Sequence, residues 1–132
     1  MGQNCCGRPI SDNEIEECKN FQDLINVMEK RQNIYKKEKE DLEAYEKDQT
    51  NIPKNVSIYS TPDDIEEMKN TADKIYNEFN RGINMLINYE KNLEFIKAKE
   101  IMKKLSLYAN EKDFNSMEDL MNELLNYCQS HF

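Results

Sequence analysis

The chain has 132 residues and a formal net charge of −8, which fits one domain with one apolar core. The negative charge, with no run of four consecutive basic residues, repels a nucleic-acid backbone, so nucleic-acid binding is not expected. No apolar run approaches the roughly 20 residues that span a bilayer, and no apolar signal region stands at the N-terminus. We therefore expect a cytosolic protein.

Residue usage predicts an all-α fold. Only three Gly and three Pro occur, and the chain between them is rich in Glu, Lys, Leu, Met, Ile and Asn, a mixture that favours helix over sheet. We expect a flexible tail over residues 1–10 and a helical domain over residues 11–132. The domain is predicted to be an elongated antiparallel helical hairpin or three-helix bundle with coiled-coil-like packing.

The first helix is predicted over residues 11–48. Ser11 and Glu14 have the spacing of a capping box, in which each side chain accepts a hydrogen bond from the backbone of the other. From Ile15 to Tyr45, apolar residues recur at intervals of three, four or seven, which places them on one helical stripe. This stripe predicts that one face of the helix packs in the domain.

A loop is expected over residues 49–61, and it is long for a connection between helices. Its apolar residues are Ile52, Val56, Ile58 and Tyr59. We expect them to pack back on the helices. The alternative is that they form a short recognition segment.

Two further helices are predicted, over residues 62–109 and 113–130. Thr61 and Asp113 have the residue types that cap helix N-termini. The sequence does not decide whether this helix is continuous or has a kink or short break within residues 82–92, because Gly82 falls on the apolar stripe. The last helix has the densest apolar stripe, so it is expected to fold back, antiparallel, on the helix before it. That stripe is Phe114, Met117, Leu120, Met121, Leu124, Leu125 and Cys128.

The N-terminal residues predict lipid attachment. Removal of Met1 would leave Gly2 with a free α-amine and no side chain, which N-myristoylation requires. Cys5 and Cys6 follow closely. Over about eight residues this start resembles the dually acylated tails of Src-family kinases and G-protein α subunits, with Cys6 where Ser or Thr is usual. The resemblance implies N-myristoyl-Gly2 together with S-palmitoylation of Cys5, Cys6 or both.

A physical argument also favours two acyl chains. One myristoyl chain binds membranes only marginally, with a partition constant of about 10⁴ M⁻¹, so stable attachment needs a second signal. A polybasic patch does not supply it, since Arg8 is the sole cation before Lys19. The alternatives are an unmodified tail and incidental or metal-binding cysteines. Cys18, Cys128 and His131 lack metal-ligand spacing with the N-terminal pair, so no metal site is predicted. Cys18 and Cys128 lie on apolar stripes, which indicates that they pack in the core.

No enzyme is expected, because the sequence has no phosphate-binding loop and no nucleophile with a base. No cofactor or small-molecule substrate is predicted either. The leading hypothesis is a scaffold or adaptor tethered to the cytosolic face of a membrane. Its partner would bind the helix faces, in a homodimer or a larger complex.

The alternative function is that of a membrane-remodelling polymer subunit. The chain is similar in outline to the myristoylated members of the ESCRT-III family, which also combine an N-terminal Gly with a long helical hairpin. The resemblance implies assembly on membranes. It departs in charge, because residues 11–48 carry 12 acids against 7 bases, whereas the family is expected to have a basic first helical region.

Overall fold

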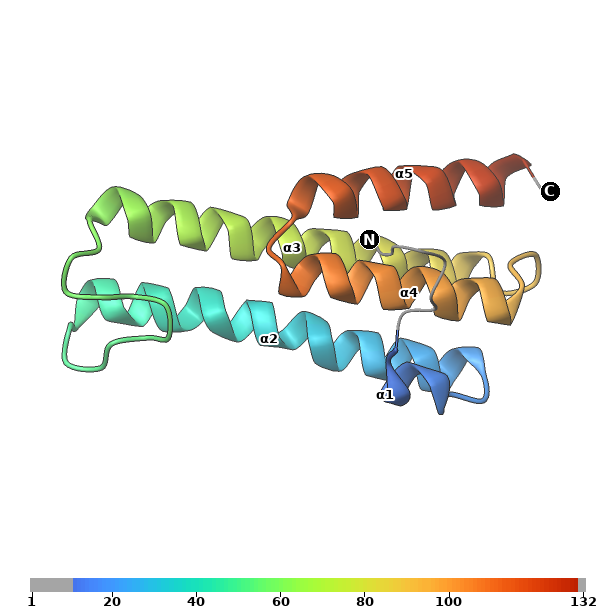
Figure 1. The fold of residues 1–132 in the computed structure, drawn as a ribbon, viewed down its shortest axis with the longest axis horizontal. Helices are drawn as coiled ribbons and strands as arrows, with labels where there is room; N and C mark the ends of the chain where they lie inside the picture. The colour runs from blue at the N-terminus through green and yellow to red at the C-terminus, as the bar shows by residue number, and fades with distance from the viewer. Residues whose placement is uncertain (1–10, 131–132) are drawn as a thin grey trace.

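The computed structural model describes residues 11–130, which contain five α-helices and no β-strand (Figure 1). The helices are α1 (Asn13–Glu16), α2 (Phe21–Lys47), α3 (Pro62–Asn88), α4 (Phe95–Asn110) and α5 (Phe114–Ser130). The predicted all-α class is therefore confirmed. None of these helices is long and apolar enough to cross a membrane.

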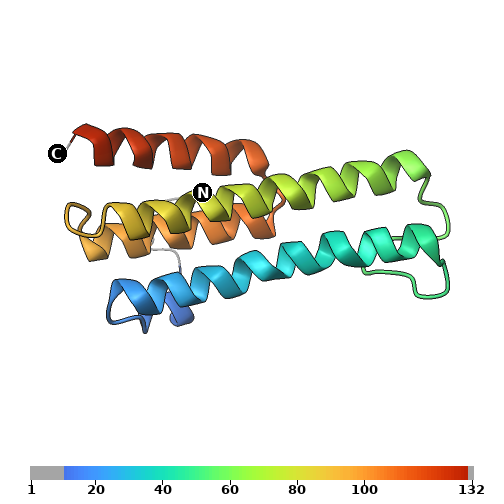
Figure 2. The same ribbon diagram turned by 180° about the vertical axis from the view of Figure 1, so that it is seen from behind.

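The longest helices, α2 and α3, lie side by side and run in opposite directions along the long axis of the molecule (Figures 1 and 2). The predicted start of α3 is confirmed. Thr61 Oγ1 accepts a hydrogen bond from the N–H of Asp64 at 3.1 Å, and Asp64 Oδ2 accepts one from the N–H of Thr61 at 2.9 Å. This capping box, followed by Pro62 in the first turn, satisfies amides that the helix itself leaves free.

Only half of the α2–α3 pair is covered by other helices. Figures 1 and 2 show α4 and α5 beside one half of the pair, while the other half projects as a two-helix arm. We call residues 41–67 the hairpin end. Leu42 and Ile65 are buried between its two helices, and Lys69 pairs with Glu46 across them at 2.7 Å. The hairpin end therefore has a thin core.

Two helices, α1 and α2, replace the single helix predicted over residues 11–48. Asp12, rather than Ser11, caps α1, because its carboxylate accepts a hydrogen bond from a first-turn amide at 3.3 Å. Asn20 then caps α2 by accepting a hydrogen bond from the N–H of Asp23 at 2.8 Å. An Asn side chain that satisfies a free amide favours a new helix start over continuation of the old helix. The intervening turn brings α1 against α4.

The helix predicted over residues 62–109 is likewise two helices, α3 and α4. The turn between them covers residues 89–94. It overlaps residues 82–92, where the sequence allows either a continuous helix or a break. The carbonyl of Tyr89 accepts a hydrogen bond from the N–H of Leu93 at 2.9 Å, and the Leu93 side chain is buried. Folding back buries the apolar stripe of α4, which a continuous helix of roughly 70 Å would leave in water.

Gly82 lies inside α3 and does not break it. It lies where α3, α4 and α5 meet, and a Cβ atom there would be 3.1 Å from Leu105 Cδ2 and 3.4 Å from the sulfur of Met121. The missing side chain therefore allows the three helices to approach closely. The largest fully buried side chains are Phe79, Ile15, Leu24, Met28, Leu42, Ile75, Leu86, Met102, Leu105, Met117, Met121 and Leu124.

The last helix starts where the sequence predicts. Asp113 Oδ1 accepts a hydrogen bond from the N–H of Ser116 at 3.1 Å, which caps α5. Directly before it, Lys112 has φ of 58° and ends α4, and the N–H of Asp113 donates to the carbonyl of Tyr108 at 2.9 Å. The short connection folds α5 against α3 and α4.

Candidate functional site

The residues predicted to carry the lipid anchor, Gly2, Cys5 and Cys6, lie outside the described residues, as does His131. The described chain begins at Ser11. The surroundings of its first residues therefore determine where the N-terminal segment leaves the helical domain.

The two cysteines of the helical domain lie in its core, as their apolar stripes predict. Cys18 is 7% exposed and Cys128 is 1% exposed. Burial raises the pKa of both thiols, and because the thiolate is the reactive form, this disfavours nucleophilic chemistry. Within residues 11–130, no group of three or more His, Cys, Asp or Glu side chains could hold a metal ion.

An ion-pair network fastens α1 to the bundle. The Arg31 guanidinium donates two hydrogen bonds to the Asp12 carboxylate, at 2.7 and 2.9 Å, and one to Glu14 at 3.1 Å. It also donates to Ser106 Oγ on α4 at 2.8 Å. The hydrogen bond from Arg31 lowers the pKa of the Asp12 carboxyl, and those from Lys30 and Arg31 lower the pKa of Glu14. Both groups therefore stay ionised to lower pH than free carboxyl groups do.

Two lysines of α4 hold the other end of α1. Lys99 Nζ donates to the backbone carbonyls of Glu16 at 2.8 Å and of Cys18 at 3.2 Å, and the buried Lys103 pairs with the Glu16 carboxylate. Ile15, between these contacts, is fully buried. We call this network the α1 clamp; its members are Asp12, Glu14, Glu16, Arg31, Lys99 and Lys103.

At the opposite end of the molecule, the loop after α2 exposes apolar side chains. Ile52 is 51% exposed, Ile58 78% and Tyr59 85%. We call these three residues the apolar tip. The expectation that the apolar residues of the loop pack back on the helices is wrong for these three, and the alternative of a recognition segment stays a prediction. Exposed apolar side chains grouped on one loop are typical of an interaction surface.

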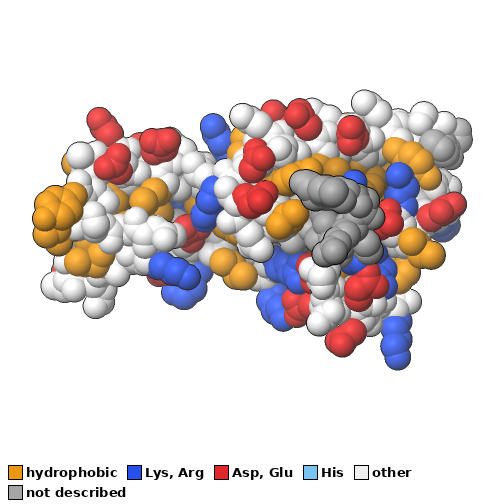
Figure 3. Space-filling model, viewed as in Figure 1, with side chains coloured by type: hydrophobic (Ala, Val, Ile, Leu, Met, Phe, Trp, Pro, Cys, Tyr) orange, Lys and Arg blue, Asp and Glu red, His pale blue; other side chains and the backbone are white. Residues whose placement is uncertain are grey.

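The hairpin end also carries much of the negative charge. Residues 41–67 contain eight Asp or Glu and two Lys, a net charge of −6 out of −8 for the whole chain. Figure 3 shows apolar side chains at the extremity of this end and acidic side chains close to them. A surface of this composition attracts basic, apolar partners and repels anionic lipid headgroups.

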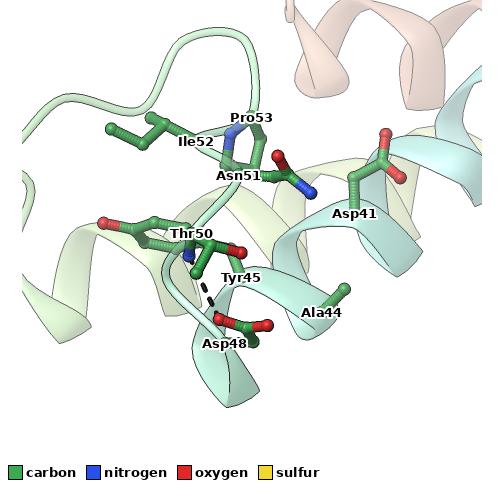
Figure 4. Close-up of a pocket in the computed structure, with 8 residues that line it drawn as sticks. All are labelled: Asp41, Ala44, Tyr45, Asp48, Thr50, Asn51, Ile52 and Pro53. Carbon is green, nitrogen blue, oxygen red and sulfur yellow. Dashed lines mark hydrogen bonds between the residues drawn. The ribbon is translucent and has the colours of Figure 1, made fainter.

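A hollow of about 380 Å³ lies beside the apolar tip, between the end of α2 and the loop (Figure 4). The N–H of Thr50 donates to Asp48 Oδ1 at 3.2 Å and shapes one wall, while Asp41 stands at the other side. Tyr45 and Pro53 add apolar surface. Two carboxylates beside apolar groups suit a basic or amphipathic side chain better than an anion.

The remaining buried polar groups have structural partners. Glu78 pairs with Arg81 at 2.9 Å, and Arg81 also donates to Asn122 on α5 at 2.8 Å. Gln32 donates to the carbonyl of Tyr76 at 3.3 Å across the α2–α3 pair. These contacts join helices within the bundle and offer no arrangement of nucleophile and base.

The described residues thus form an all-helical protein. Ion pairs hold its N-terminal helix at one end, and at the other end an exposed apolar loop lies between the acidic ends of α2 and α3. Comparison with protein-family models, with curated proteins and with solved structures finds no match to this chain.

Proposed function

We propose that this protein is a membrane-tethered helical adaptor that binds a partner protein through its hairpin end. In this proposal Gly2 carries myristate, Cys5 or Cys6 carries palmitate, and both acyl chains hold the protein at the cytosolic face of a membrane. The supporting observation is the separation of the two ends. The α1 clamp lies beside the start of the described chain, whereas the apolar tip is exposed at the opposite end (Figure 1).

Charge supports two acyl chains over one chain with a basic patch. A single myristoyl chain gives only marginal membrane binding. Residues 2–18 contain one base, Arg8, and the acids Asp12, Glu14, Glu16 and Glu17, so an anionic leaflet adds no attraction. A second acyl chain is the remaining source of stable attachment, and Cys5 and Cys6 are the acceptors nearest to Gly2.

The helices set the distance between anchor and partner. From Arg31 in the α1 clamp to Lys47 at the end of α2 the helix rises about 24 Å, at 1.5 Å per residue. Because the clamp joins α1 to both α2 and α4, the N-terminal segment starts from a defined place on the bundle. The apolar tip would thus be presented at a distance from the point of attachment.

The partner is expected to be a protein segment with apolar and basic side chains. Tyrosine is among the residues that supply most of the binding energy of protein interfaces. Tyr59 and its neighbour Ile58 are the most exposed large apolar side chains among the described residues. The net charge of −6 over residues 41–67 adds attraction for Lys and Arg. Coiled-coil-like packing with a partner helix is part of the proposal, which includes no enzymatic step and no cofactor.

Fractionation of cells tests the anchor. Gly2→Ala should release the protein from membranes, and the double change Cys5→Ser with Cys6→Ser should weaken attachment nearly as much. High salt should leave the wild type bound, whereas hydroxylamine, which cleaves thioesters, should release it. If the cysteine double variant stays on membranes while Gly2→Ala leaves them, a bound partner replaces the second acyl chain.

Proximity labelling in cells tests the tip. Ile58→Asp with Tyr59→Asp should remove the labelled partner while leaving membrane attachment unchanged. Ile87→Asp with Ile96→Asp is the matched control, because these residues are 55% and 75% exposed and lie at the other end of the α2–α3 pair. If both double variants lose the labelled partner equally, the apolar tip is not the binding surface. Salt-dependent polymerisation on liposomes would favour membrane remodelling instead.

A further inference from the structure

The hollow beside the apolar tip has one wall on α2 and the other on the loop that follows it (Figure 4). Asp41, Tyr45 and Asp48 follow one another along α2 and its C-terminal cap at spacings of four and three residues, which favours one helix face. The loop contributes Asn51 and Ile52, and Ile52 is 51% exposed. The hollow therefore combines an aromatic ring, two carboxylates and an exposed aliphatic side chain.

The same helix holds a lysine by a similar pair of side chains. Tyr35 and Glu38 are also three residues apart on α2. Lys112 Nζ lies 4.8 Å from the centroid of the Tyr35 ring, and it donates to the two Glu38 carboxylate oxygens at 2.8 and 3.0 Å. In this structure, a Tyr and an acid three residues later thus bind an ammonium group by a cation–π contact and charge-assisted hydrogen bonds.

Tyr45 and Asp48 repeat this spacing further along α2, and their carboxylates and those beside them are accessible. Within residues 11–130 no Lys or Arg pairs with Asp48, whose Oδ1 accepts a hydrogen bond from the N–H of Thr50 at 3.2 Å. Asp41 pairs with Lys37 at 3.1 Å, but these side chains are 50% and 74% exposed, and exposed pairs of this kind contribute little to stability. A basic side chain of another protein can therefore compete for both carboxylates.

We propose that this hollow binds a lysine or arginine side chain of the partner protein, and that an apolar residue next to it in the partner packs on Ile52. The inference rests on the proposed function, in that the hairpin end binds a protein, and it does not depend on acylation. The stem of the basic side chain contacts Tyr45 and Pro53. Its cationic end contacts the carboxylates of Asp41 and Asp48.

The charge of the hairpin end agrees with this occupant. Residues 41–67 carry a net charge of −6, which attracts a basic segment and raises its rate of encounter with the hollow. A phosphate or a carboxylate would meet two aspartates there and be repelled. The volume of about 380 Å³ lies at the small end of the range of about 300 to 1,000 Å³ that is usual for ligand sites, which suits a single side chain.

Nuclear magnetic resonance titration of the isotope-labelled, full-length protein tests the inference. The probe is the peptide acetyl-Gly-Ser-Leu-Lys-Leu-Ser-Gly-amide. Its matched control carries Nε-acetyllysine, which has the same stem without the charge. The amide signals of Thr50 and Asn51 should shift saturably with the lysine peptide, and the acetylated peptide should bind about tenfold more weakly, because it lacks charge-assisted hydrogen bonds. Equal affinity of the two peptides, or no shift with either, overturns the inference.

Two double variants separate the hollow from the net charge of the protein. Asp41→Asn with Asp48→Asn should weaken binding of the lysine peptide about tenfold, while the new amide oxygen can still accept from the N–H of Thr50. Glu40→Gln with Glu43→Gln removes the same charge at exposed positions of α2 outside the hollow, so its affinity should stay within about twofold of the wild type. If both double variants weaken binding equally, the hollow does not bind the basic side chain.

Proximity labelling in cells distinguishes failure of this inference from failure of the proposed function. Asp41→Asn with Asp48→Asn should lose the partner that the wild type labels. If this variant retains a partner that Ile58→Asp with Tyr59→Asp loses, the hairpin end binds a protein without using the hollow, and only the inference is overturned. If neither double variant loses a partner, the proposed function fails as well.

Discussion

Replacement of Arg31 by Met removes the centre of the α1 clamp and should loosen α1 without unfolding the bundle. Arg31 makes four side-chain hydrogen bonds, two to Asp12 and one each to Glu14 and Ser106. The Arg31 side chain is 18% exposed and that of Asp12 is 16% exposed, so water screens this pair only in part. Each hydrogen bond to a charged group contributes about 1.5 to 3 kcal/mol.

The loss of stability on replacing Arg31 should be smaller than the sum of these four hydrogen-bond energies, because α1 can leave the bundle while the other helices stay folded. Detachment exposes Ile15, whose burial is worth about 1.5 to 3 kcal/mol, and releases the contacts of Lys99 and Lys103. We expect the free energy of holding α1 to fall by about 3 kcal/mol. That change corresponds to a roughly hundredfold larger equilibrium constant for local opening.

Hydrogen exchange resolved along the chain measures this opening. The N–H groups of Glu16, Glu17 and Cys18 donate to backbone carbonyls within α1 at 2.9 to 3.1 Å, so their protection reports on the helix. Arg81→Met is the matched control, since Arg81 contacts α3 and α5 and should leave these amides unchanged. If α1 in Arg31→Met stays as protected as in the wild type, the clamp does not hold it.

The same network predicts an acid dependence. Arg31 holds the pKa of Asp12 below its ordinary value of 3.8. The contribution of the pair to stability is therefore complete above that value and is lost as pH falls through the lower pKa of the folded state. In the wild type, the protection of the α1 amides from hydrogen exchange, corrected for intrinsic exchange rates, should decrease as pH falls below 3.8. Arg31→Met should show a weaker dependence, because the Asp12 cap on Ile15 and the Lys30–Glu14 pair remain.

Further predictions concern the core. Leu124→Ala should lower the free energy of unfolding by about 2 to 5 kcal/mol in urea denaturation, whereas the exposed Ile96→Ala should change it by less than about 0.5 kcal/mol. Gly82→Val should cost about 1 to 3 kcal/mol or more, because even a Cβ atom lies 3.1 Å from Leu105 Cδ2. Burial raises the pKa of Glu78, so the folded state loses stability as pH rises through that pKa. Glu78→Gln should therefore gain stability relative to the wild type as pH rises above 4.5, the ordinary pKa of a Glu side chain, as measured by urea midpoints.

Local sequence signals predicted the helix class and the starts of two helices. The caps at Thr61 and Asp113 depend on hydrogen bonds that reach three residues, so the residue types alone indicate them. The breaks near Asn20 and at residues 89–94 were harder to predict. Both interrupt apolar stripes that would suit a continuous helix, and their advantage comes from burial against helices distant in sequence.

The features of the candidate site also differ in whether the sequence alone could predict them. Lipid attachment at Gly2, Cys5 and Cys6 could be predicted from the sequence, because it depends on a few consecutive residues, and it stays a prediction since these residues lie outside the described part of the chain. The α1 clamp could not be predicted, since Arg31 reaches Asp12 across 19 residues and Ser106 across 75. Nothing in the local sequence distinguishes Arg31 from another helix-surface cation.

The sequence by itself determined an acidic all-helical chain, because composition, periodicity and capping act over a few residues. Only the tertiary structure decided that α4 ends halfway along the α2–α3 pair and leaves the hairpin end uncovered. It also decided that Ile58 and Tyr59 are exposed. Exposure is a property of what surrounds a side chain, and in this fold neither α4 nor α5 extends far enough to cover the hairpin end.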